Sequence, residues 1–182
     1  MKIVELLDGM RRPYLDELSS VADEHEYHIE PVLRLSDGQA ARDGMFGTPC
    51  RYDFVRKDTG EVCSIETAQR MELAPIRLEL DGKLLDISTF SWDWLTLDIA
   101  GLSADMARTP IQNWFMRWFD EDDTNPQNAE SLYGVVHFMS DAKQIDGGVR
   151  FCIDLGSAPA SAVAELIEEL LSQGAEGLAL RG

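Results

Sequence analysis

One tight turn constrains the fold of this chain more than any other feature of its sequence. Asp81-Gly82 is a strong two-residue turn signal between two runs that alternate in polarity. Pairing Leu80 with Lys83 places the apolar residues of both runs on one face, and these are Ile76, Leu78, Leu85 and Ile87. The same alignment pairs Arg77 with Asp86 on the opposite face. Two unlike properties agree on one register, so the sequence predicts an antiparallel hairpin here.

A second hairpin is expected around Lys57-Asp58-Thr59-Gly60. With that turn, Phe54 faces Cys63, and Cys50 and Cys63 are not cross-strand partners. The chain has three cysteines, Cys50, Cys63 and Cys152, without a Cys-x-x-Cys pair or a zinc spacing. We therefore expect reduced thiols, with no disulfide, no metal and no cofactor.

Further periodic segments define the fold class. Apolar residues at helical spacing predict a helix over residues 13–24 and another that starts near Ser157 or Pro159 and ends at Gly174. Strands are expected at residues 27–35, 90–99, 134–140 and 149–155, with a last strand near the C-terminus. The sequence predicts a single α+β domain over residues 1–182, with a largely antiparallel sheet and the C-terminal helix packed on one sheet face.

A third helix is expected over residues 110–119, with Thr109 as its cap and Pro110 in its first turn. One face of this helix is unusually aromatic and carries Ile111, Trp114, Phe115, Trp118 and Phe119. Such a face is typical of a core helix. The alternatives are a partner-binding stripe centred on Trp114 and Trp118, or a contact between two copies of the chain.

Net charge limits the partners of the chain. Its 33 acidic residues against 16 basic ones give a formal charge of −17 over 182 residues. Nucleic acids and anionic membrane surfaces are disfavoured, because binding to them depends on lysine and arginine. A basic protein surface is favoured instead. The sequence shows no signal peptide and no apolar run of about 20 residues, so we expect a cytoplasmic protein.

The densest acidic run is Asp120, Glu121, Asp122 and Asp123. A calcium loop needs a glycine at its sixth position and a glutamate at its twelfth, but Asn125 and Ser131 stand there. We expect a solvated loop that supplies a charged rim for a partner. A longer irregular segment, residues 36–49, contains three glycines and a proline, and it could cap a ligand pocket.

One set of residues has the composition of a thiol-dependent catalytic site. If Ser140 pairs with Val149 in the C-terminal strands, His137 lies opposite Cys152. Asp154 is then close enough to orient the imidazole, which would activate the Cys152 thiol. Strand interiors seldom present a nucleophile, and no oxyanion hole is evident. The sequence therefore favours a non-catalytic protein that binds and regulates or neutralises a basic partner, with the thiol enzyme and a small-ligand-binding domain as alternatives and a homodimer left open.

Overall fold

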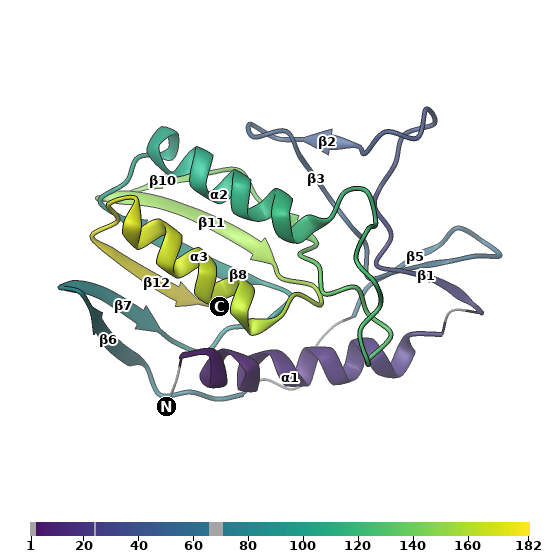
Figure 1. Ribbon diagram of the computed structural model, residues 1–182, viewed down its shortest axis with the longest axis horizontal. Helices are drawn as coiled ribbons and strands as arrows, with labels where there is room; N and C mark the ends of the chain where they lie inside the picture. The colour runs from purple at the N-terminus through teal and green to yellow at the C-terminus, as the bar shows by residue number, and fades with distance from the viewer. Residues whose placement is uncertain (1–2, 24, 66–70) are drawn as a thin grey trace.

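A seven-stranded sheet with helices on one face forms the body of the protein (Figure 1). The computed structural model describes residues 3–23, 25–65 and 71–182. Across the sheet the strands are β10 (Lys143–Ile145), β11 (Gly148–Asp154), β8 (Leu95–Ala100), β12 (Gly177–Arg181), β7 (Lys83–Ile87) and β6 (Ile76–Leu80), and β9 (Phe138–Met139) also pairs with β11. All pairings are antiparallel except β12 with β7, so the sheet is mixed.

Two smaller sheets extend from this body. One has the order β1 (Tyr27–Ile29), β4 (Phe54–Arg56) and β5 (Val62–Cys63). The other pairs β2 (Arg42–Asp43) with β3 (Thr48–Pro49), within the segment predicted as an irregular loop. Figure 1 shows both small sheets beyond the same end of the main sheet. The chain is thus an α+β fold, as predicted.

Both predicted hairpins are confirmed with their registers. Leu80 pairs with Lys83 across the Asp81-Gly82 turn, and Arg77 pairs with Asp86. The Arg77 guanidinium donates two hydrogen bonds to the Asp86 carboxylate, at 2.7 and 2.8 Å. Phe54 pairs with Cys63 in the other hairpin. These alignments were predictable because each depends on residues close together in the chain.

Two of the three described helices cover one face of the main sheet, and the third packs beside them (Figure 1). Helix α2 (Ala104–Phe119) and helix α3 (Ala160–Ser172) lie over one face of the main sheet, and α1 (Ile3–Val21) lies against α3 (Figure 1). The α3 start at Ala160 matches the prediction, and its apolar face is buried. None of the helices in the described ranges is long and apolar enough to cross a membrane.

Two helices begin earlier than predicted. Helix α2 starts at Ala104, where the Ser103 side chain accepts a hydrogen bond from the Met106 amide and caps the first turn. Helix α1 starts at Ile3. In both helices the proline at which the predicted range begins, Pro110 or Pro13, lies inside the helix. The predicted end of the first helix at residue 24 lies outside the described residues.

The aromatic face of α2 belongs to the core. Trp114 and most of its apolar neighbours on the helix are fully buried, and its indole N–H donates to the Ala162 carbonyl of α3 at 2.7 Å. Trp118 is half-buried. Trp92 and Trp94, which lie in the strand predicted over residues 90–99, diverge at a turn in which Ser91 bridges Trp94. As a result Trp92 is buried and Trp94 is 49% exposed.

We predict that Trp114→Ala lowers the free energy of unfolding by about 3–5 kcal/mol, because it leaves a large cavity and an unpaired carbonyl between α2 and α3. Met106→Ala on the exposed side of the same helix is the control and should change stability by less than about 0.5 kcal/mol. Urea denaturation of both variants measures the difference. Equal, small effects would show that Trp114 does not pack in the core.

Candidate functional site

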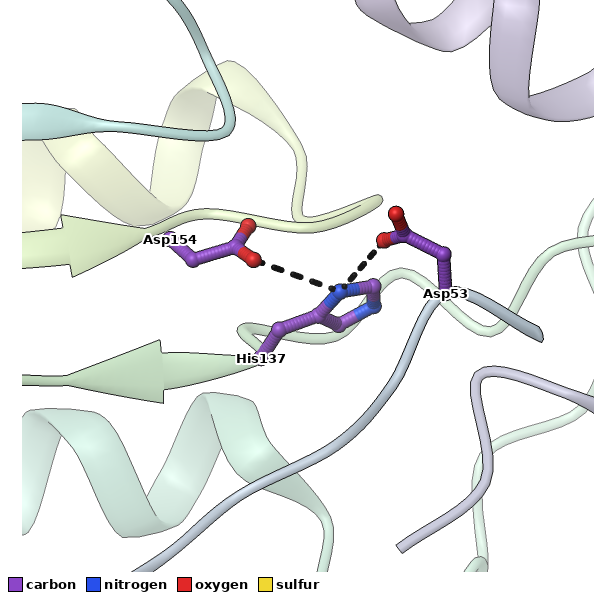
Figure 2. Close-up of side chains that lie close together, drawn as sticks. All are labelled: Asp53, His137 and Asp154. Atoms are coloured by element: carbon purple, nitrogen blue, oxygen red, sulfur yellow. Dashed lines mark ion pairs between the residues drawn. The ribbon is translucent and has the colours of Figure 1, made fainter. Parts of the chain in front are cut away.

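A fully buried histidine surrounded by carboxylates lies where the main sheet meets the β1–β4–β5 sheet. The His137 Nε2 atom is 2.8 Å from Glu30 Oε1, and neither side chain is exposed to solvent. On the other side of the ring, His137 Nδ1 lies 3.1 Å from Asp53 Oδ1 and 3.8 Å from Asp154 Oδ2 (Figure 2). We call these four residues the His137 cluster.

Four separate segments contribute to this cluster. Glu30 follows β1, Asp53 precedes β4, His137 precedes β9, and Asp154 ends β11. The backbone is shaped for the contact, because Glu30 has a left-handed φ of 48° and Gly156 has a φ of 49°. A Cβ atom on Gly156 would lie 2.3 Å from His137 Cδ2. Only glycine therefore lets the chain after β11 pass so close to the ring.

Backbone amides hold the Glu30 carboxylate in place. The Tyr133 amide donates to Oε2 at 2.8 Å, and the Ser157 amide donates to Oε1 at 3.2 Å. The Arg51 side chain also donates to the Glu30 carbonyl at 2.6 Å. A buried carboxylate with several donors is stable as an anion, so Glu30 fixes one end of the imidazole.

Hydrogen bonds also orient the two aspartates. Asp53 accepts from the Tyr14 hydroxyl of α1 at 2.7 Å and from the Ile65 amide at 2.6 Å. Asp154 Oδ1 accepts from the Gly156 amide at 2.9 Å, which leaves Oδ2 facing His137. His137 Nδ1 itself has no aligned hydrogen-bond partner among the described residues, despite the short distance to Asp53.

The cluster shifts the protonation of its members. Burial alone would lower the pKa of His137, but the nearby carboxylates of Asp154, Asp53 and Glu30 raise it to about 10. Burial raises the pKa of Asp154 to about 7, against the opposing effect of His137. Burial also acts to raise the pKa of Glu30 and of Asp53, yet their contacts with His137 lower both values. The cluster therefore combines an imidazolium with carboxylates inside the protein.

The predicted alignment of His137 with Cys152 is wrong. Met139 pairs with Ile153 and Phe138 pairs with Asp154, instead of Ser140 with Val149. The physical reason is the tight Asp146-Gly147 turn, which lets β10 pair with the first residues of β11. Strand β9, which precedes β10 in the chain, therefore pairs with the last residues of β11.

The structure brings together only part of the proposed thiol site. Asp154 lies beside His137, but both ring nitrogens face carboxylates, and the described contacts of His137 do not include Cys152. The thiol close enough to sense the charge of His137 is Cys50, whose pKa is raised chiefly by burial.

Arginines bind the acidic loop after α2. Asp123 pairs with Arg34 at 3.1 Å and with the buried Arg51 at 2.9 Å, while Glu121 pairs with Arg42. Asp120 has a left-handed φ of 53° and caps the turn by accepting from Thr124 and Asn125; Asp122 is exposed. The loop is thus exposed to solvent at Asp122 and Asp123, as predicted, and ion pairs also connect it to the segment that contains β1–β3.

A cavity of about 490 Å³ lies beneath the β2–β3 arm, in the segment predicted to cap a pocket. Its apolar lining includes Leu33, Ala41, Cys50, Phe138 and Met139. Polar groups from Arg42, Asp43 and Asp141 stand at the same cavity. This composition, mostly apolar with few polar groups, is typical of small-molecule sites.

Sequence reasoning missed Glu30 and Asp53 as members of the His137 cluster. Glu30 and His137 are separated by more than one hundred positions, and no local periodicity connects them. The one available signal was Glu30 itself, an acidic residue directly before Pro31 in the strand predicted over residues 27–35. The sequence does not show that this side chain is buried, and only a buried carboxylate requires a partner inside the protein.

We predict that Glu30→Gln lowers the free energy of unfolding by about 3 kcal/mol, because it removes the charged partner of His137 Nε2 and weakens the hydrogen bonds that the Tyr133 and Ser157 amides donate to this side chain. The control is Asp86→Asn, which removes the charge of the exposed Arg77 pair and should leave stability nearly unchanged. Chemical denaturation at neutral pH compares the two. Equal losses would contradict a special role for the buried pair.

Comparisons with known proteins do not assign the chain to a family. Neither the family models, nor the curated proteins, nor the solved structures contain a match to the chain. The function is therefore argued from the surface and the sites that the structure describes.

Proposed function

We propose that the protein acts by non-catalytic binding of a basic protein partner. The observation that carries this proposal is that the arginine side chains pair within the chain. Every arginine that the structure describes, apart from Arg108, forms an ion pair with an acidic side chain of the same chain. Arg108 donates to the Met45 carbonyl. The described arginines thus pair mainly within the chain, and the whole sequence keeps a formal excess of −17, which favours a basic partner.

A groove between the β6–β7 turn and the end of α3 is the surface that best fits such a partner. It has a volume of about 460 Å³ and is lined by Leu80, Leu171 and Ser172, together with Asp81, Lys83 and Glu168. Figure 1 shows the hairpin turn and the end of α3 at the same side of the molecule. The Lys83 ammonium donates to the Leu171 carbonyl, so its charge is directed at the helix end.

The chemistry of this groove selects the kind of partner segment. Leu80 is 37% exposed and offers an apolar contact, while Asp81 and Glu168 add negative charge at the rim. A segment that presents an apolar side chain flanked by lysine or arginine would satisfy both features. The groove differs from the surface predicted from sequence, where Trp114 is buried and Asp123 is paired.

We predict that a variant with Asp81→Asn and Glu168→Lys binds the partner at least tenfold more weakly than the wild type. The experiment immobilises each protein, applies native lysate at low salt, identifies a stoichiometric basic protein released at high salt, and then measures its Kd by calorimetry. Affinity should fall with ionic strength, because both charges at the rim are exposed and screened.

The matched control carries Asp16→Lys and Asp122→Asn, the same change in net charge at exposed positions away from the groove. It should bind nearly as well as the wild type. Equal weakening of both variants would contradict the groove as the binding site, and the absence of any stoichiometric basic protein would contradict the proposed function.

The cavity under the β2–β3 arm favours a second candidate function, binding of a small molecule. Cys50 lines this cavity and provides a probe, because a bound ligand would shield its sulfur. Alkylation of Cys50 by iodoacetamide, monitored by mass spectrometry in the presence of a small-metabolite library, tests this candidate. Protection of Cys50 without protection of Cys63 would support it, and uniform reactivity throughout the library would contradict it.

A further inference from the structure

The His137 cluster has the arrangement of a metal site as well as that of an ion-pair junction. Asp53, His137 and Asp154 each offer one potential ligand atom, and these atoms all lie within 4.8 Å of one another. Figure 2 shows the two carboxylates converging on the Nδ1 side of the ring. Bond lengths of about 2.0–2.2 Å to one ion place its ligands about 3.0–3.6 Å apart. The 3.1 and 3.8 Å separations are close to that range.

An independent observation indicates that a ligand belongs at this point. His137 Nδ1 is fully buried and has no hydrogen-bond partner among the described residues. Buried polar atoms are rarely left unsatisfied, because the loss of water is then uncompensated. The nearest carboxylate oxygen, from Asp53, is at hydrogen-bond distance but not in hydrogen-bond alignment. A cation between the three side chains would satisfy the Nδ1 atom and both carboxylates.

The surrounding contacts are those that support metal ligands. A ligating histidine usually directs its other ring nitrogen to a carboxylate, and His137 Nε2 meets Glu30 at 2.8 Å. Asp53 is held by the Tyr14 hydroxyl, and Asp154 by the Gly156 amide. Each ligand is therefore oriented before an ion arrives.

The charges of the cluster also favour a divalent cation. Three carboxylates, from Glu30, Asp53 and Asp154, surround one imidazole. Even a protonated imidazole supplies only one positive charge. When an ion of charge two coordinates Nδ1, the proton on that nitrogen leaves to solvent and the buried negative charge is better balanced.

We propose that Asp53, His137 and Asp154 bind one divalent transition-metal ion, of the class of Zn²⁺ or Mn²⁺. The donor set of one imidazole nitrogen and carboxylate oxygens suits these ions, whereas Ca²⁺ takes six to eight oxygen ligands. The ion has a structural role, since His137 is fully buried, Asp53 is nearly so, and even Asp154 has only 24% of its side chain exposed. It would join α1, the β1–β4–β5 sheet and the end of β11.

The test begins with protein stripped by a chelator and dialysed into metal-free buffer. Calorimetric titration with ZnCl₂ and with MnCl₂ should show one equivalent bound, and the bound ion should raise the melting temperature by several degrees. Asp154→Asn should weaken binding at least tenfold, because it removes a charged ligand while its amide oxygen still accepts from Gly156. The control, Asp93→Asn, removes a nearby charge outside the ligand set and should bind as the wild type does.

A second measurement on the wild-type protein does not depend on the folding of any variant. Bound Mn²⁺ broadens nearby amide resonances, so those of Ile65 and Gly156, which donate to the two aspartates, should disappear at one equivalent. Absence of stoichiometric binding, equal weakening by Asp93→Asn, or persistence of these two resonances while exposed acidic segments broaden would each overturn the proposal.

Discussion

The contact between His137 and Glu30 is the interaction on which the arrangement of this fold depends. Both side chains are fully buried, so neither can exchange its partner for water, and removal of one leaves the other with a lost contact that no water replaces. Tyr14, Asp53, Tyr133 and Ser157 complete the network through donated or accepted hydrogen bonds. Helix α1, the small β1–β4–β5 sheet and the end of β11 are thereby fixed to one point.

Interactions between sequence neighbours were predictable, and those between distant segments were not. The Asp81-Gly82 hairpin follows from turn chemistry, alternating polarity and one charge pair, all within a dozen residues. The α3 helix follows from its apolar period. The α2 start was misplaced because Thr109-Pro110 imitates an N-terminus, while the side chain that caps the helix is that of Ser103. The parallel pairing of β12 with β7 depends on the whole sheet, and no local pattern indicates it.

The candidate site could be predicted only in part for the same reason, because its residues come from segments that are distant in the sequence. Sequence reasoning placed His137 near Asp154, but the short Asp146-Gly147 turn changed the register and removed Cys152 from the group. Glu30 and Asp53 come from an earlier part of the chain, and only the folded structure brings them to the ring. The net charge, unlike the site, could be predicted fully from the sequence, because composition alone gives the acidic excess. The structure adds that the arginines are used internally, which supports a binding role for the carboxylates that remain.

Native-state hydrogen exchange of the wild-type protein tests most directly whether the His137 cluster is the junction of the fold. The amides of Ile65, Tyr133, Gly156 and Ser157 all donate to its carboxylates, although they lie in segments without regular secondary structure. If the cluster joins these segments to the core, their amides exchange only with the opening that also exposes β8. Exchange of these four amides at the fast rates of surface loops, while β8 stays protected, would contradict this account.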